Sequence, residues 1–187
     1  WSVANALEIS ATTLGPKLFW ANVQYIAYSL APVAWLIMVL YHTGKGHLAT
    51  RKRVLLMLIT PMITNVLLWL DAAYGLVRHD IYLNTSGAFP VIAKEYGPWF
   101  WVHCLQSYVL SFSSAYLLVQ AVQRSALVYR IQSVLLLIGT SIIIVVNLLY
   151  VTGIGLIKHY DITPIVFSIV GALIAWGIFE FRLFVLV

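Results

Sequence analysis

The chain has 187 residues, of which 62% are hydrophobic and only 9% are charged. Because water-soluble domains carry roughly 25% charged residues, this composition excludes a soluble catalytic or binding domain. The net charge of +5 does not indicate nucleic-acid binding either, since the basic residues lie in short loops beside apolar segments and form no soluble basic face.

The chain opens with a short apolar segment, Trp1–Glu8, which is compatible with a helix but too short to cross a bilayer. It lacks the charged start and cleavage site of a signal peptide. We interpret it as the tail of a preceding helix. The last residues, Phe181–Val187, stop without a loop or cap, so we expect both ends to continue in a longer protein.

Five apolar runs of bilayer length follow. Crossing roughly 30 Å of hydrocarbon takes about 20 helical residues. Backbone groups in lipid must be satisfied within a helix or a closed barrel, and these runs lack the alternation of barrel strands. The sequence therefore predicts an all-α, polytopic transmembrane helical bundle. The predicted spans are Leu18–His42, Val54–Asp71, Pro98–Val122, Ile131–Thr152 and Thr163–Val187.

The basic residues predict the orientation, because short loops rich in Lys and Arg stay cytoplasmic. Seven fall on one side of the predicted spans, and four fall on the other. The first group is Lys45, Arg51, Lys52, Arg53, Arg124, Arg130 and Arg182, and the second is Lys17, Arg78, Lys94 and Lys158. We therefore expect the residues before Leu18 outside and Val187 inside.

The longest connection lies on the predicted outer side. Two short extended stretches, His79–Leu83 and Phe89–Glu95, flank the polar turn Asn84–Gly87. Pro90 restricts the second stretch to an edge strand. The sequence predicts a small extracellular hairpin that caps the bundle.

Two spans contain a proline, Pro32 in the first and Pro61 in the second. Proline removes a backbone hydrogen bond and kinks a helix. A static kink and a hinge used in signalling both remain open.

Polar side chains gather in the outer third of the spans. His103 and Gln106 are three residues apart and share one helical face. Such groups should face the bundle interior or a water-filled cavity. The alternatives are an aromatic belt for the Trp and Tyr residues and interhelical hydrogen bonds for Gln106 and Asn147. The candidate ligand pocket comprises Asn22, Gln24, Asp71, Trp99, His103, Gln106, Asn147 and Tyr150.

The last span carries a second candidate site near its cytoplasmic end. Glu180 and Arg182 are either an interfacial charge set or a contact that changes as this helix moves to give the output signal. Four small residues of the same span would let another helix approach closely. They are Gly171, Ala172, Ala175 and Gly177.

The sequence indicates no catalytic residues, no metal site and no cofactor. It has no His-Glu-x-x-His motif. No lysine lies mid-span to hold a retinal Schiff base, and no histidines pair at mid-membrane depth to hold haem.

Several motifs together carry a family resemblance, and the most specific is Tyr96-Gly-Pro-Trp-Phe-Trp-Val-His103. The others are Lys17–Trp20, Gln24–Tyr25, Pro32–Trp35, Tyr41–Gly44, Arg124–Ser125, Tyr129–Gln132, Asn147–Tyr150, Asp161–Pro164 and Phe181–Phe184. In this order they resemble the N-terminal seven-helix sensor region of bacterial membrane histidine kinases, a module similar to one in some diguanylate cyclases. The family pattern has an Asn, followed by a His, where this chain has Leu70–Tyr74.

The resemblance implies that residues 1–187 are a single membrane-embedded sensor domain, a fragment of a longer signalling protein, with one or two helices before Trp1. It implies an unidentified small-molecule or lipid-phase stimulus, a cytoplasmic C-terminus and a homodimer in the bacterial inner membrane. The output domain in cis would be a histidine kinase or, next, a diguanylate cyclase, and this chain itself would not be an enzyme.

A small solute transporter is the alternative function. It needs a polar path through the inner half of the membrane as well as the outer. The inner halves of these spans are nearly pure Leu, Ile and Val, which favours the sensor.

Overall fold

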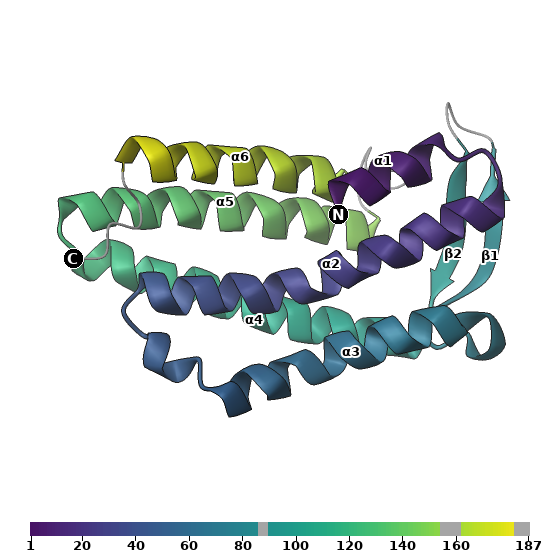
Figure 1. Ribbon diagram of the computed structural model, residues 1–187, viewed down its shortest axis with the longest axis horizontal. Helices are drawn as coiled ribbons and strands as arrows, with labels where there is room; N and C mark the ends of the chain where they lie inside the picture. Colours follow the sequence, from purple (N-terminus) through teal and green to yellow (C-terminus); the bar gives the residue numbers. More distant parts are fainter. Residues whose placement is uncertain (86–89, 154–161, 182–187) are drawn as a thin grey trace. The chain divides into compact units, whose positions relative to one another are not determined.

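The computed structural model describes residues 1–85, 90–153 and 162–181, and the side chains of these residues except 71–73, 128 and 176–181. Figure 1 traces the described elements, which are helices apart from one hairpin. In chain order they are α1 (Ser2–Ser10), α2 (Leu14–His42), the 3-10 helix η1 (Gly46–Leu48), α3 (Arg51–Tyr74), β1 (Arg78–Asn84), β2 (Val91–Tyr96), α4 (Pro98–Arg124), α5 (Leu127–Thr152) and α6 (Thr163–Phe181).

The predicted all-α polytopic bundle is confirmed. Within the described residues, four helices are long and apolar enough to cross a bilayer. They are Leu14–His42, Arg51–Leu70, Pro98–Arg124 and Tyr129–Thr152. The last predicted span corresponds to α6, whose apolar stretch Thr163–Ala175 is shorter than a full crossing and whose predicted continuation, residues 182–187, lies outside the described part.

The outer surface of the helices is apolar, as a lipid environment requires. On α3, for example, Leu55, Leu56 and Val66 are 55%, 58% and 59% exposed. Contiguous exposure of this kind on several helices is a liability in water but costs nothing against lipid tails.

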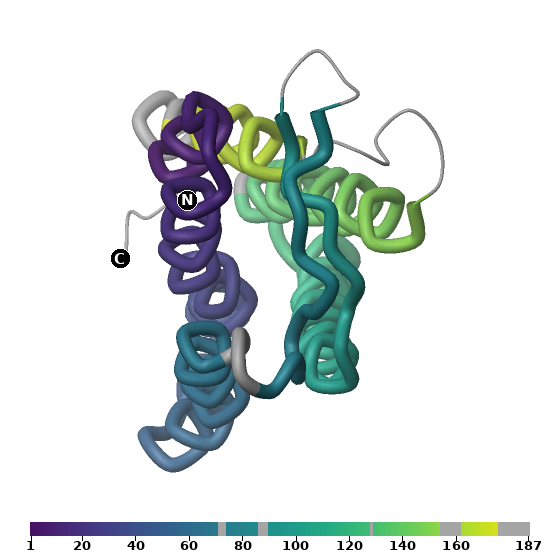
Figure 2. Tube along the Cα trace, turned by 90° about the vertical axis from the view of Figure 1, so that its right-hand side faces the viewer, coloured from purple at the N-terminus to yellow at the C-terminus, as the bar shows by residue number. Residues whose placement is uncertain are grey.

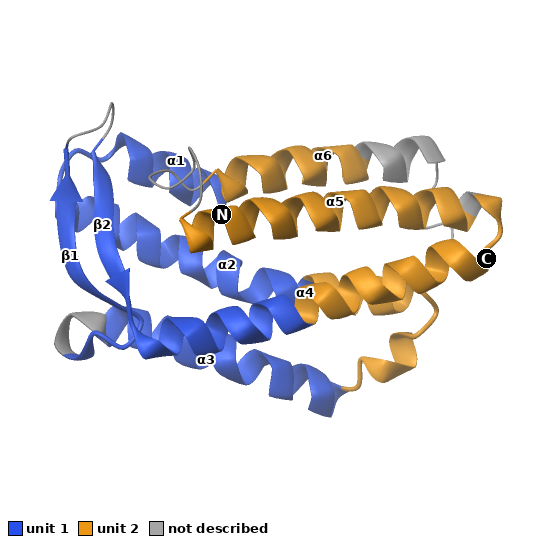
Figure 3. Ribbon diagram, turned by 180° about the vertical axis from the view of Figure 1, so that it is seen from behind, with its two compact units in different colours: residues 1–34, 51–109 blue, residues 35–50, 110–187 orange. Residues whose placement is uncertain are grey.

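The chain divides into two compact units, coloured separately in Figure 3. Unit 1 comprises Trp1–Ala34 and Arg51–Val109, and unit 2 comprises Trp35–Thr50 and Leu110–Val187. Helices α2 and α4 each begin in unit 1 and end in unit 2, so each of these helices contributes residues to both units.

In unit 1, a lysine joins α1 to α2. Lys17 is only 1% exposed, and its Nζ donates hydrogen bonds to the carbonyl oxygens of Glu8 at 2.7 Å and Ile9 at 3.4 Å. These carbonyls belong to the last turn of α1, where a helix lacks intrahelical donors and carries partial negative charge. Lys17 therefore caps the C-terminal end of α1 from a buried position. From the sequence alone it was expected to be a charged loop residue.

The predicted hairpin is confirmed as a two-stranded antiparallel sheet of β1 and β2. Figure 2 shows the two strands running side by side. Its extracellular location stays a prediction. The register pairs Arg78 with Tyr96 and His79 with Glu95, and it shifts between His79 and Tyr82. Pro90 precedes β2 and leaves the ladder intact.

Unit 2 has an apolar core at the meeting of three helices. Val39 of α2, Leu118 of α4 and Leu136 of α5 are at most 2% exposed, and Ile174 of α6 packs against them. Helices α5 and α6 lie side by side in Figures 1 and 2. A Cβ at Gly139 of α5 would lie 2.7 Å from the Val170 Cγ1 atom, so glycine permits this close approach.

The small residues predicted to line a contact of the last span do not face α5. A Cβ at Gly171 would meet nothing within 4 Å, and Gly171, Ala172 and Ala175 are exposed. The contact with α5 instead uses Val170 and Ile174 on α6 and Gly139 on α5. Gly177 lies outside the described side chains.

Candidate functional site

The segment that leads from β2 into α4 positions the candidate site. Gly97 passes so close to the preceding connection that a Cβ there would lie 2.3 Å from the Leu76 carbonyl oxygen. The backbone N–H groups of Gly97 and Trp99 donate to the carbonyls of Val77 and Leu76, each at 2.9 Å. Pro98 is the first residue of α4, where its missing N–H costs nothing.

Aromatic packing fixes the first turn of α4. The rings of Tyr96 and Phe100 stack with centroids 3.7 Å apart at 9°. Trp101 lies edge-on to Phe100 at 5.4 Å, and Phe100 is 2% exposed. The rotation of α4 is thereby set, so that His103, one turn further, is buried inside unit 1.

His103 is the centre of a polar network that joins α2, α3 and α4. Its side chain is 1% exposed. Nδ1 lies 3.3 Å from the Thr64 hydroxyl of α3, Nε2 lies 3.4 Å from the Ser107 hydroxyl, and the ring centroid lies 5.5 Å from that of Tyr28 of α2. We call Tyr28, Thr64, Trp99, His103 and Ser107 the His103 network.

The hydroxyl of Thr64 decides the proton positions in this network. It donates to the Thr60 carbonyl at 2.7 Å and accepts from the Trp99 indole N–H at 2.9 Å. Because its single proton is used on Thr60, His103 must donate through Nδ1–H, and in the neutral imidazole Nε2 is then the acceptor for the Ser107 hydroxyl. One threonine therefore orients both the tryptophan and one tautomer of the histidine.

Gln106 compensates for the proline of α3. Pro61 has no N–H, so the carbonyl of Met57, four residues earlier, lacks its helical donor. The Gln106 Nε2 group of α4 donates to this Met57 oxygen at 2.7 Å. Among the alternatives left open for Gln106, the structure shows the interhelical hydrogen bond.

A second polar contact links α3 to α2 in the same unit. The Asn65 Nδ2 group donates to the Ser29 hydroxyl at 2.8 Å and to the Pro61 carbonyl at 2.8 Å. Ser29 in turn donates to the carbonyl of Ile26. This contact lies directly beside the His103 network, because Asn65 follows Thr64 on α3 and Ser29 follows Tyr28 on α2.

Asn22 and Gln24 make structural contacts apart from the His103 network. Asn22 accepts a hydrogen bond from Arg78 Nη2, which ties α2 to the hairpin, and both side chains are buried. Gln24 accepts from Asn5 Nδ2 at 3.3 Å and donates to the Glu8 carboxylate, so it joins α2 to α1.

The remaining predicted site residues lie either in unit 2 or among the side chains outside the described set. Asn147 and Tyr150 lie on α5 in unit 2. Asp71 and Glu180 lie on helices, but their side chains are outside the described set, as is Arg182. The single outward-opening pocket and the role of Glu180 and Arg182 in signal output therefore stay predictions.

Sequence reasoning missed the hydroxyl groups of the His103 network and both groups of the neighbouring Asn65–Ser29 contact. Thr64, Ser107, Ser29 and Asn65 carry no motif, because hydroxyl residues in membrane helices commonly bond their own helix. The proline was the available signal, since Pro61 predicts a freed carbonyl at Met57 and hence a donor from a neighbouring helix.

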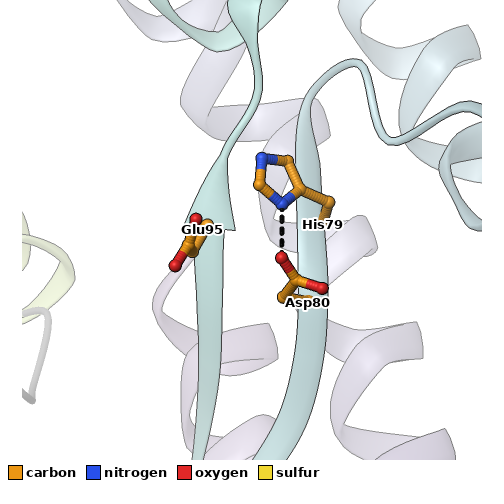
Figure 4. A group of neighbouring side chains, drawn as sticks. All are labelled: His79, Asp80 and Glu95. Atoms are coloured by element: carbon orange, nitrogen blue, oxygen red, sulfur yellow. Dashed lines mark hydrogen bonds and ion pairs between the residues drawn. The ribbon is translucent and has the colours of Figure 1, made fainter.

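Among the described residues, one group of side chains has the atoms to hold a metal ion. His79, Asp80 and Glu95 of the hairpin each offer one ligand atom, and these atoms lie within 4.8 Å of one another (Figure 4). From the sequence no metal site was expected, because the chain has no His-Glu-x-x-His motif and no paired histidines at mid-membrane depth.

Comparison with known protein families shows which family the chain belongs to. The family model for the N-terminal 7TM region of histidine kinase matches residues 1–187. The chain belongs to this family. No curated protein and no solved structure matches the chain.

Membership in the histidine kinase 7TM family agrees with the bundle of membrane helices. The chain is a multi-pass membrane module of the sensory region of histidine kinases, and this region is not itself catalytic. The resemblance carried by the Tyr96–His103 motif is confirmed at the level of the family. In the structure, this motif is the segment that starts α4 and places His103.

Proposed function

We propose that this module senses a stimulus in unit 1 and passes it through α4 to α6, and from there to a cytoplasmic output domain. The single observation that carries the proposal is the burial of a histidine among hydrogen-bonding partners on neighbouring membrane helices. An ionisable residue in a membrane interior is costly and is typically retained for function.

The His103 network has the properties expected of a part of the protein that switches between two conformations. Its contacts are directional and few, so a modest rotation of one helix exchanges one set of hydrogen bonds for another. Within the described residues, Asn65 Oδ1 and Gln106 Oε1 are buried without a hydrogen-bond partner. Buried orphan acceptors favour a donor, so a small polar molecule or a change in hydration is the stimulus we expect.

Helix α4 supplies the route between the units. It runs from Pro98 to Arg124, so His103 of unit 1 and Leu118 of unit 2 belong to one continuous helix. In unit 2, Leu118 is fully buried in the core against which Ile174 of α6 packs. A movement of α4 therefore reaches α6 by direct packing, and coupling of about 1–3 kcal/mol is enough for a useful response.

The output proposed is a histidine kinase that follows residue 187, with a diguanylate cyclase as the second possibility. The proposed setting is the bacterial inner membrane, with a cytoplasmic C-terminus and a homodimeric assembly. Family membership and the excess of basic residues in the loops predicted to be cytoplasmic support this setting.

The test uses the full-length protein in lipid nanodiscs with labelled ATP. Thr64→Val removes the hydroxyl that orients His103 and Trp99 while keeping the side-chain volume. We expect it to change the autophosphorylation rate by about 5-fold or more, the lower end of typical coupling. The matched control is Thr152→Val, whose exposed hydroxyl bonds only its own helix.

Equal autophosphorylation in wild type, Thr64→Val and Thr152→Val, with all three folded, would contradict a sensory role for the network. Failure of the full-length protein to transfer phosphate from ATP, together with synthesis of a cyclic dinucleotide from GTP, would assign the cyclase instead. Facilitated flux of a solute through liposomes that hold this module alone would favour the transporter.

A further inference from the structure

The hairpin departs from regular strand geometry at one residue. Successive side chains of a strand point to opposite faces, so His79 and Asp80 would ordinarily be separated by the sheet. The register shifts between His79 and Tyr82, and Asp80 has φ +49°, which only a few non-glycine residues adopt. Such a bulge re-aims a side chain.

The result is a convergence of three different ligand groups. His79 pairs directly with Glu95 across the strands, and the bulge turns Asp80 toward them. The His79 Nδ1 and Asp80 Oδ2 atoms are 2.9 Å apart, and the three ligand atoms lie within 4.8 Å of one another. Figure 4 shows the ring and the Asp80 carboxylate facing each other beside Glu95 on the other strand.

These separations suit a first-row transition metal. Zn²⁺ binds His nitrogen and carboxylate oxygen at about 2.0–2.2 Å, so tetrahedral ligand atoms lie about 3.3 Å apart. A small side-chain rotation brings the observed separations to this value. An imidazole ligand disfavours Mg²⁺ and Ca²⁺, which prefer oxygen.

The surroundings leave the group open to an ion. The His79 and Asp80 side chains are 41% and 75% exposed. Lys94, the cation adjacent to Glu95 in sequence, lies on the opposite face of β2, where its Nζ is 5.6 Å from the Tyr96 ring centroid. The two carboxylates thus meet the ion without a lysine between them, and a fourth position remains for water.

We propose that His79, Asp80 and Glu95 form a binding site for one divalent transition-metal ion, with Zn²⁺ as the preferred ion. The site rests on the hairpin geometry alone and does not depend on the proposed signalling function. Binding fastens β1 to β2 at the end of the ladder nearest α3 and α4.

The test is a titration of the tag-free full-length protein in nanodiscs with ZnCl₂, followed by calorimetry, and with CoCl₂, followed by visible absorption. The variants are His79→Gln, Asp80→Asn and Glu95→Gln. Asparagine tolerates positive φ, so Asp80→Asn keeps the bulge and removes only the charge. His47→Asn, an exposed histidine on η1, is the matched control.

We expect one Zn²⁺ per chain, with affinity reduced at least about tenfold by each of the three variants, since even losing a group that only orients a ligand costs that much. The His47→Asn protein should bind as wild type does. Absence of saturable binding to wild type, or binding that the three variants leave unchanged, would overturn the site. So would equal affinity for MgCl₂ or CaCl₂. Each result is independent of kinase output.

Discussion

The two units of the molecule differ in the arrangement of their interiors: a buried histidine network marks unit 1, and an apolar cluster marks unit 2. Unit 1 is held by hydrogen bonds and charges between elements, such as Lys17 to α1, Arg78 to Asn22 and His103 to Thr64. Unit 2 combines an apolar core around Leu118 with side-chain hydrogen bonds between its elements, which join Trp35 to Thr140, His42 to Ser133 and Lys45 to Gln120. The same two helices, α2 and α4, take part in both.

The contrast fits the proposed division between reception in unit 1 and transmission in unit 2. Lipid tails are as apolar as leucine, so apolar helix contacts depend on close packing, while hydrogen bonds supply direction. Directional contacts have discrete alternatives, whereas a close-packed core resists deformation and transmits displacement. Under the proposed function, a stimulus would exchange the hydrogen bonds of unit 1, while the core of unit 2 would keep its packing.

The largest effect should come from opening the core of unit 2. Leu118→Ala leaves a cavity and should lower the free energy of unfolding by about 2–3 kcal/mol, in the lower half of the range for buried leucines because lipid competes for apolar surface. Leu105→Ala on the same helix, 68% exposed, should change it by less than about 0.5 kcal/mol. Denaturation in mixed micelles measures both, and equal losses would contradict a packed core in unit 2.

A smaller effect should come from forcing α5 and α6 apart. Gly139→Ala places a methyl group 2.7 Å from Val170 and should cost about 1–3 kcal/mol. Adding Val170→Ala should restore most of the loss. The control Gly171→Ala meets open space and should be neutral or slightly stabilising, since alanine favours a helix. Thermal melting of the four proteins tests the contact, and a neutral Gly139→Ala would show that α6 does not pack here.

The smallest effect on the free energy of unfolding should come from removing the hydrogen bond between Gln106 and the Met57 carbonyl in unit 1. Gln106→Leu leaves the Met57 oxygen unpaired and should cost about 1 kcal/mol. In a Pro61→Ala background, the new N–H at residue 61 can bond Met57 itself, so the same change should cost much less. A double-mutant cycle of unfolding free energies measures the difference. Strict additivity would contradict the view that Gln106 replaces the missing helical hydrogen bond.

The long elements of the fold were predictable because bilayer thickness fixes their length. The predicted span Pro98–Val122 corresponds to α4, and Ile131–Thr152 to α5, within a few residues at each end. The first span begins earlier than predicted, at Leu14. The predicted start was late because Lys17 was taken for a loop residue. In the structure Lys17 is part of the helix, and its side chain donates to carbonyl groups at the end of α1.

The candidate site was predicted only in part. A shared helical face brought His103 and Gln106 together from sequence spacing alone, and both contact α3. Asn22 and Gln24 have similar depth in sequence but bind the hairpin and α1. Depth along a span can be read from sequence, whereas the facing helix depends on packing rotation, which here follows from the aromatic stack at the start of α4.

The geometry of the hairpin shows a further limit of pattern reasoning. Turn residues predict a hairpin, and the register then pairs His79 with Glu95. The bulge that redirects Asp80 could not be recognised from the sequence. Aspartate is only one of several residue types that tolerate positive φ, so its presence does not mark a bulge. Three ligand groups on one face therefore become visible only in three dimensions.

The proposed transmission is tested most directly by measuring the distance between α5 and α6 while a residue of unit 1 is changed. Spin labels at Ser141→Cys on α5 and Leu173→Cys on α6, both exposed positions, report the interhelical distance in the full-length protein with Cys104→Ala. We predict that Thr64→Val shifts the distance distribution and the autophosphorylation rate together, while Thr152→Val changes neither. A changed rate with an unchanged distribution would contradict transmission through α4 and α6.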